Sequence, residues 1–116
     1  MKALLILALS LMSVSASAES IYCTFTEPFL TVTYNSETNK IRVDSAEHGS
    51  AETTAHVIFK SGGILHIDAE GITQYLEVNL TKEGSDGMSD AIYPFEGKIS
   101  ELLVGGCETD TLKKRQ

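Results

Sequence analysis

The segment from Gly84 to Asp90 holds the residue types that most readily do chemistry. Ser85, Asp86, Ser89 and Asp90 place two carboxylates and two hydroxyls within six residues. Carboxylates with backbone carbonyls can hold a hard cation such as calcium, or they can form the polar lip of a binding site. The alternative is structural, because Asp and Ser side chains commonly hydrogen-bond the backbone amides of their own turn. The spacing does not fit the calcium loop D-x-[DN]-x-[DN]-G, so we predict no metal and no cofactor.

The three histidines, His48, His56 and His66, are the available bases and metal ligands. His66 and Asp68 lie two apart on a predicted strand, so both side chains project from the same face. A serine of 84–90 could complete a catalytic set with them, but the sequence lacks the G-x-S-x-G turn typical of that chemistry. His56 and His66 flank a predicted turn, yet two ligands are too few for a zinc site. The pattern favours a surface histidine beside a carboxylate over an assembled catalytic set.

The first 18 residues have the pattern of an export signal. Lys2 precedes an apolar run over 3–12, and Ala16-Ser17-Ala18 is a small-x-small cleavage site. The run is too short to span a bilayer, and the alternative is a buried N-terminal element. The predicted organisation is a signal peptide at 1–18, one domain at 19–108 and a polar tail at 109–116. The predicted localisation is periplasmic or secreted, with no membrane span after cleavage.

Composition limits the classes of partner. The chain has 116 residues, with 9 Lys+Arg against 16 Asp+Glu, and its net charge is -7. Cleavage after residue 18 removes only Lys2 among the charged side chains, so the charge becomes 8 − 16 = −8. Nucleic acids and anionic membranes bind basic faces, and both are therefore excluded as expected partners.

Two cysteines, Cys23 and Cys107, remain after the predicted signal. An even pair in an exported chain predicts a disulfide, and the sequence has no Cys-x-x-Cys that would favour redox or metal chemistry. The bond would join the first predicted strand to the last. It would close a loop of 107 − 23 = 84 residues, which the chain-entropy account values at about 4.5 kcal/mol.

Beyond residue 18, apolar and polar residues alternate with a period of two, which is typical of half-buried strands. The clearest hairpin has Ser61-Gly62-Gly63 as its turn, and 45–54 and 82–90 are polar segments predicted as loops. The predicted strands are 21–26, 30–34, 40–44, 55–60, 64–69, 73–81, 91–99 and 102–107. The predicted fold is all-β: one small antiparallel barrel or sandwich of about seven or eight strands in a meander. An eight-stranded barrel has an interior that side chains just fill or that holds one small ligand.

Three motifs together resemble a group of bacterial envelope proteins and lipoproteins that has no established activity. That group carries an early Glu-Pro-Phe-Trp segment, a late Cys-Ser-Asp-Gly-Met-Ser-Asp…Tyr-Pro segment and a closing Gly-Cys. The matching residues here are Glu27-Pro28-Phe29, the run 85–90, Tyr93-Pro94 and Gly106-Cys107. Most of the chain after the predicted signal is covered by the resemblance.

Two positions depart from that group. Leu30 stands where the group has Trp, and Gly84 stands where it has a Cys that could pair with the closing one. Pairing Cys107 with Cys23 instead would leave the loop less constrained. The resemblance implies a binding site at one end of the barrel, where the strands bearing the two motifs meet. Its implied residues are Glu27, Ser85, Asp86, Ser89, Asp90 and Tyr93.

Two functions from different classes are compatible with these features. The first is a non-enzymatic binding module of the cell envelope, with an envelope protein or a small ligand as its partner. A specific form is an inhibitor whose acidic surface docks on a basic cell-wall hydrolase such as lysozyme. Members of the resembled group are sometimes fused to domains that resemble inhibitors of C-type lysozyme. The alternative is a small hydrolase or metal-dependent enzyme that uses Asp86, Asp90 and a histidine.

Overall fold

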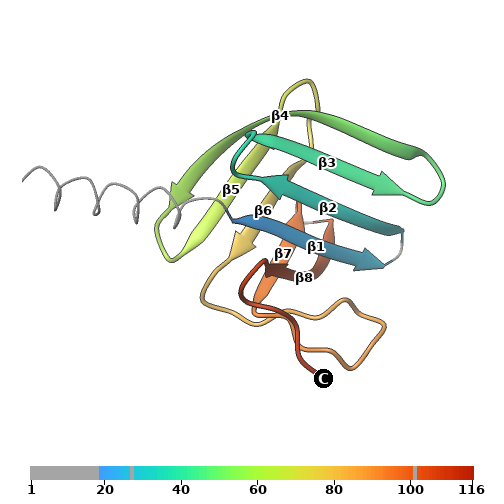
Figure 1. Ribbon diagram of the computed structural model, residues 1–116, viewed down its shortest axis with the longest axis vertical. Helices are drawn as coiled ribbons and strands as arrows, with labels where there is room; N and C mark the ends of the chain where they lie inside the picture. Colours follow the sequence, from blue (N-terminus) through green and yellow to red (C-terminus); the bar gives the residue numbers. More distant parts are fainter. Residues whose placement is uncertain (1–18, 27, 101) are drawn as a thin grey trace, which may run out of the picture.

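Eight antiparallel strands in chain order form the fold, and each strand pairs with the next (Figure 1). The computed structural model describes residues 19–26, 28–100 and 102–116, so the predicted signal at 1–18 and Glu27 lie outside the described residues. The strands are β1 Ser20–Thr26, β2 Phe29–Asn35, β3 Lys40–Ser45, β4 Gly49–Lys60, β5 Ile64–Ala69, β6 Tyr75–Asn79, β7 Phe95–Ile99 and β8 Leu103–Thr109. Because β8 pairs back with β1, the sheet closes into a barrel. The predicted all-β meander is confirmed, as a barrel and not a sandwich.

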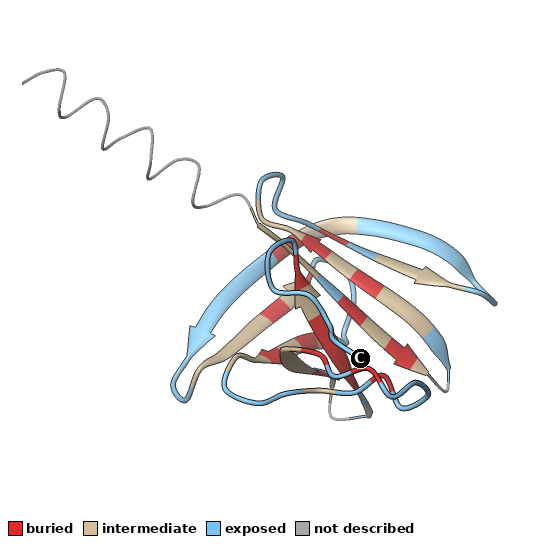
Figure 2. Ribbon diagram, turned by 60° about the horizontal axis from the view of Figure 1, so that its bottom comes forward, coloured by how far each residue is buried: buried red, intermediate tan, exposed pale blue. Residues whose placement is uncertain are grey.

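Burial follows the alternation of the sequence. In β1 the side chains of Cys23 and Phe25 are buried, and those of Tyr22, Thr24 and Thr26 between them are not. The same pattern recurs in β2, β5 and β6, where inward-facing apolar residues meet across the barrel. Figure 2 shows buried positions as red bands that alternate with tan ones along several strands. The period of two therefore sets both the strands and the core.

The disulfide predicted between Cys23 and Cys107 is confirmed. The two cysteines are direct partners in the β1–β8 pair that closes the barrel, and both are buried. The closing pair depends on glycine as well, because a side chain at Gly105 would lie 2.6 Å from the ring of Phe25. Strand closure, the disulfide and the fully buried ring of Phe25 therefore coincide on one side of the barrel.

The prediction of a loop over 45–54 is wrong from Gly49 onward. Strand β4 begins at Gly49, and its first half, as far as Thr54, pairs with β3. This half carries no large apolar side chain, because one face meets solvent and the other faces the end of the barrel. Ala51 is the only member of the first half that belongs to the usual apolar residues. Alternation of small and polar residues gave no apolar signal for a strand.

The long connection between β6 and β7 folds back across the outside of β8. Predicted strand 91–99 is a strand only from Phe95, because residues before it return along this connection, where Tyr93 pairs with Gly84. The buried ring of Tyr93 packs over Gly106, where an added Cβ would lie 2.4 Å from the ring. The glycine at 106 thus allows the connection to lie flat on the barrel wall.

The residues after β8 dock on the same connection. The backbone N–H and C=O of Arg115 both bond to Ile92, at 2.9 and 2.7 Å. The guanidinium of Arg115 also reaches the carboxylate of Glu83 at 2.7 Å. The polar tail predicted at 109–116 is exposed from Asp110 onward, whereas Thr109 is buried and is the last residue of β8. Backbone pairing holds the tail against the barrel.

Candidate functional site

Asp86, the centre of the predicted site loop, is turned inward to its own backbone. Its side chain is buried, and its carboxylate accepts hydrogen bonds from the backbone N–H groups of Met88 at 2.8 Å and Ser89 at 2.7 Å. The hydroxyls of Ser89 at 2.7 Å and Tyr93 at 3.1 Å donate to its second oxygen. These bonds, led by the one from the Ser89 backbone, hold the pKa of Asp86 far below its usual range. The structure thus brings Asp86, Ser89 and Tyr93 together as a cap of the loop.

The other residues of the predicted site are arranged less tightly. Ser85 is exposed, and its hydroxyl accepts a hydrogen bond from the N–H of Gly87 at 3.1 Å. Asp90 is exposed to solvent. Glu27 lies outside the described residues, but its neighbour Thr26 donates from its hydroxyl to the Asp86 carbonyl at 2.9 Å. The end of β1 and the loop therefore meet at one end of the barrel.

The capping arrangement limits what the loop can do chemically. Each oxygen of Asp86 already accepts two hydrogen bonds, which uses the lone pairs that a cation would need. Among the described residues, no group of three or more His, Cys, Asp or Glu side chains is placed to hold a metal ion. The loop is therefore best described as a rigid support that presents its tip, including exposed Met88, to solvent.

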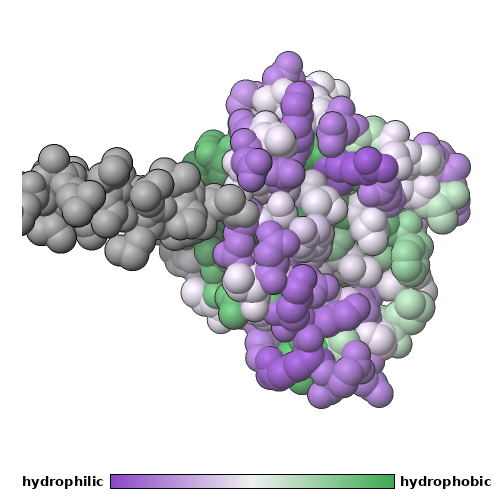
Figure 3. Space-filling view, in the orientation of Figure 1, coloured by the Kyte–Doolittle hydropathy of each residue, from purple (hydrophilic) through white to green (hydrophobic). Residues whose placement is uncertain are grey.

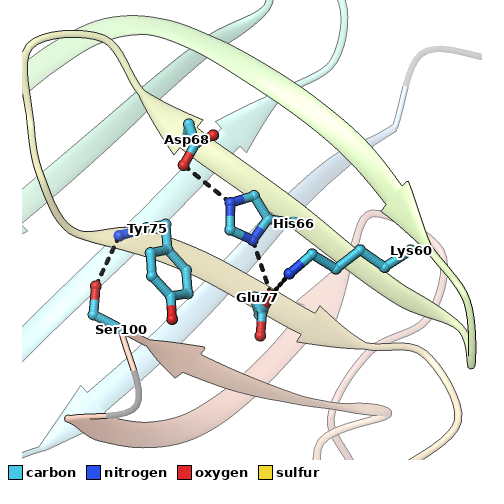
Figure 4. A network of polar contacts seen from close by, with 6 residues as sticks. All are labelled: Lys60, His66, Asp68, Tyr75, Glu77 and Ser100. Carbon is cyan, nitrogen blue, oxygen red and sulfur yellow. Dashed lines mark hydrogen bonds and ion pairs between the residues drawn. The ribbon is translucent and has the colours of Figure 1, made fainter.

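A second polar cluster lies on the outer face of β5 and β6 (Figure 4). His66 contacts Glu77 through Nδ1 at 2.8 Å and Asp68 through Nε2 at 3.0 Å. Lys60 reaches the same Glu77 oxygen at 2.9 Å, and the ring of Tyr75 stacks on His66 with centroids 4.7 Å apart. The bond to Glu77, followed by that to Asp68, raises the pKa of His66, whereas the bond from His66 lowers the pKa of Glu77.

We call this cluster, formed by the side chains of Lys60, His66, Asp68, Tyr75 and Glu77, the clasp. Its geometry does not suit a catalytic base. Both ring nitrogens of His66 lie within hydrogen-bond distance of a carboxylate, so neither is left to accept a proton from a nucleophile. The sequence predicted that His66 and Asp68 share a face, and they do. Sequence analysis missed Glu77, which lies directly opposite His66 in the pairing of β5 with β6. Aligning the alternating apolar residues of the two predicted strands could have given this pairing.

The clasp is linked to the rim of the barrel. On the adjoining edge of β6, the backbone N–H of Tyr75 donates to the hydroxyl of Ser100 at 2.9 Å, and the N–H of Ser100 donates back to the Tyr75 carbonyl at 3.0 Å. Ser100 has a positive φ of 46° in the β7–β8 turn. The cluster thus fastens β4, β5, β6 and this turn together from outside.

A third feature, which sequence analysis did not locate, is an apolar cavity at the open end of the barrel. It has a volume of about 380 Å³. Its lining consists of Leu30, Val43, Ala51, Ile72, Gln74, Ile99, Leu102 and Leu103. A smaller hollow of about 50 Å³ shares Val43, Ile72 and Ile99 with it and extends toward the core. A sequence signal that could have found it is the single apolar residue Ile72 in an otherwise polar turn.

The cavity exists because β4 contributes so little volume to the interior. Opposite Val43 the register places Ala51, and opposite Ser45 it places Gly49. On the other side of the barrel, β1 contributes the fully buried ring of Phe25. Small residues on one wall and large ones on the other leave space at the β3–β4 end.

Apolar side chains also surround the mouth of this cavity. Leu102 is 76% exposed and Ile72 is 41% exposed. By contrast, hydrophilic side chains cover most of the face seen in Figure 3, and the apolar colour on that face collects toward its margins. Exposed apolar residues grouped at an opening indicate a surface that becomes covered.

Comparisons of the chain with protein-family models, with curated proteins and with solved structures returned no match. Within the described residues, no helix has the length and apolar character needed to cross a membrane. The geometry of the loop, the clasp and the cavity therefore has to carry the functional assignment. Of the three, the cavity is the one that combines an apolar lining with exposed apolar side chains at its mouth.

Proposed function

We propose that the protein is an exported, non-enzymatic binding module of the cell envelope that takes an apolar group of its ligand into the open end of the barrel. The observation that carries this proposal is the cavity of about 380 Å³ lined by Leu30, Val43 and Ile99, among others. This volume falls within the range of small-molecule sites, about 300–1,000 Å³, which are typically concave and mostly apolar.

The lining defines the chemistry of the ligand. None of the residues that line the cavity is ionisable, and the amide of Gln74 is the sole polar side chain among them. A charged group would lose its hydration there without gaining a partner, whereas an alkyl or aromatic group would gain about 25 cal/mol for each Å² it buries. We therefore propose an amphiphile or apolar molecule whose polar end stays at the rim.

Export and an envelope location are supported by three independent features. The sequence of 1–18 has the pattern of a signal peptide. The Cys23–Cys107 disulfide is typical of oxidising compartments. The resemblance to bacterial envelope proteins points the same way.

The inhibitor form of the binding module keeps one supporting observation, the net charge of -7. An acidic protein associates faster with a basic hydrolase, and salt weakens that steering. Salt-sensitive inhibition of lysozyme at equimolar ratio would favour it. The enzymatic alternative has less support, because the oxygens of Asp86 are taken up by the loop itself.

The test is binding of an uncharged apolar dye, phenylnaphthylamine, whose fluorescence rises in a dry site. Saturable binding by the native protein is expected, and Leu30→Trp should weaken it about tenfold, or 1.4 kcal/mol, by filling the cavity. The matched control is Phe29→Trp, which places the same ring one residue earlier in β2. There the side chain lies on the outer face, and Phe29 is 50% exposed.

Native-like dye binding by Phe29→Trp would assign the effect of Leu30→Trp to the cavity. Because the chain has no Trp of its own, the emission of each introduced indole also reports directly whether it is buried. The proposal is overturned if the native protein shows no saturable binding, or if Leu30→Trp binds the dye as tightly as the control.

A further inference from the structure

The second half of β4 has a free edge. Strand β4 pairs with β3 only through Thr54, the partner of Lys40 at the start of β3. From Ala55 to Lys60 it pairs with β5 on its other side. In Figure 1 this half runs toward the lower left with β5 on one side only. No strand of the described chain lies along the opposite edge.

The backbone groups at this edge can be assigned from the neighbouring contacts. Ala55 bonds to Asn39 on the β3 side, because its N–H donates to the Asn39 carbonyl at 3.0 Å and its C=O accepts from the Asn39 amide at 2.8 Å. Alternate residues of an antiparallel strand direct their N–H and C=O to the same edge. Val57 and Phe59 therefore point theirs away from β5, beyond the reach of Asn39.

The side chains along this edge are apolar and exposed. Val57, Ile58 and Phe59 are 39%, 54% and 67% exposed, and Figure 2 shows the whole segment in the colour of exposed residues. Proteins usually protect such an edge with a charge, a proline or a bulge. None of these devices occurs at 57–59, so the edge is a template for another strand.

We propose that the free edge of β4 binds the same edge of a second copy of the chain, as an antiparallel pair with its two-fold axis at Ile58. In this register Val57 of each copy lies opposite Phe59 of the other. All the outward N–H and C=O groups of these two residues then pair. Ile58 lies opposite Ile58 of the second copy on the outer face. The same segment of each copy therefore supplies the hydrogen-bond partners of the other, as a two-fold interface requires.

Charges beside the edge do not oppose this pairing. The same register sets Lys60 of one copy opposite His56 of the other. Lys60 already lies 2.9 Å from Glu77, and His56 lies 3.5 Å from Glu70. The net charges of the two copies do repel, so added salt should strengthen a dimer. Salt would weaken the docking of a basic partner at the same edge, and this opposite sign separates the two occupants.

The first test is the oligomeric state of the purified protein, measured by sedimentation equilibrium over a range of concentrations and salt. We expect a reversible dimer that salt strengthens. Val57→Pro removes the outward N–H without removing a bond to β5, and it should weaken the dimer at least about tenfold with unchanged circular dichroism. Val57→Ala keeps that N–H and should weaken it less.

A second test locates the axis. Opposed residues in a non-hydrogen-bonded antiparallel pair have Cα atoms about 4.5 Å apart, within reach of a disulfide. Ile58→Cys should therefore oxidise to a covalent dimer. Val104→Cys is the matched control, because Val104 is 56% exposed on another strand, and it should form no covalent dimer in the same assay.

A native protein that is monomeric at every concentration overturns the proposal. So does a dimer that Val57→Pro leaves intact, or one in which Ile58→Cys cross-links no faster than Val104→Cys. The apolar cavity lies at the other end of the barrel, so dye binding remains an independent measurement of that site.

Discussion

On the side where β1 meets β8, the interior is filled by the ring of Phe25 and by the Cys23–Cys107 bond, whereas beside β3 and β4 it is partly empty. On the filled side, beside β1 and β8, the disulfide links the strands from inside the barrel. On the open side, contacts among His66, Glu77 and Lys60 link β4, β5 and β6 on their outer face. The strands that these outer contacts hold keep Ile67, Leu76 and Val78 in the packed core, and the turn between β5 and β6 lends Ile72 and Gln74 to the cavity lining.

The largest expected effect concerns the fastening of the filled side. Replacing both Cys23 and Cys107 by alanine should lower the free energy of unfolding by about 4 kcal/mol, because the bond closes a long loop. Urea denaturation of the variant and of the reduced native protein measures it, and the two should agree. A loss below about 1 kcal/mol would show that the β1–β8 pair holds this side without the bond.

The next effect tests the loop that covers the filled side. Asp86→Asn replaces an acceptor by a donor that faces N–H and hydroxyl groups, and should lower the free energy of unfolding by about 2–3 kcal/mol. The pKa of Asp86 is lowered from its ordinary value of 3.8. Its contribution is therefore present above that value and is lost as the pH falls. Denaturation at neutral and acid pH should show that the variant has lost this part of the acid sensitivity.

Asp90→Asn is the control for that measurement, because Asp90 is an exposed aspartate of the same loop. It should change the free energy of unfolding by less than about 0.5 kcal/mol. Equal losses in the two variants would contradict a specific capping role for Asp86.

A smaller effect is expected at the clasp of the open side. His66→Gln should lower the free energy of unfolding by about 1–2 kcal/mol, since hydrogen bonds to charged partners are lost. The pKa of His66 is raised above 6.5, so its contribution is present below 6.5 and lost as the pH rises through the folded value. The pKa of Glu77 is lowered from 4.5, so its contribution is lost as the pH falls below that value.

Thermal denaturation as a function of pH should therefore place the greatest effect of His66→Gln between 4.5 and 6.5. His48→Gln serves as the comparison, because the side chain of His48 is 84% exposed. If both variants follow the same pH profile, the outer cluster does not fasten the open side.

The smallest expected effect on the free energy of unfolding comes from comparing two residues of β2, one that borders the cavity and one in the packed core. Leu30→Ala should cost only about 1 kcal/mol, because Leu30 already borders open space and leaves no new enclosed void. Val32→Ala, two residues along β2 and buried at 2% exposure, should cost about 2 kcal/mol although it removes fewer atoms. Urea denaturation of the two variants gives the order, and the reverse order would mean that the cavity is filled in solution.

The contrast between the two sides also explains what the sequence could predict. Period-two alternation in segments such as 21–26 fixed most strands, and the even cysteine count predicted the bond between the first strand and the last. The first half of β4 escaped notice because its inward residues, Gly49 and Ala51, are small. Those same residues create the cavity, so the features that hid the strand also hid the site.

The loop at 84–90 was a different case. Its residue types allowed both a polar binding lip and a self-capped turn, and composition cannot choose between them. The choice depends on where the N–H groups of Met88 and Ser89 point, which is set only when the loop folds over β8. Glu77 was missed for a related reason, since its meeting with His66 depends on the register of two strands.

The bond between Cys23 and Cys107 also gives the chain the topology of a ring. Every turn of the barrel lies between these two residues, so a protease that cuts any one turn opens the ring without releasing a fragment. A nicked molecule would keep all its strands tethered and could re-form the same sheet. In the exported location that we propose, a cut at one exposed turn would therefore leave the molecule in one piece.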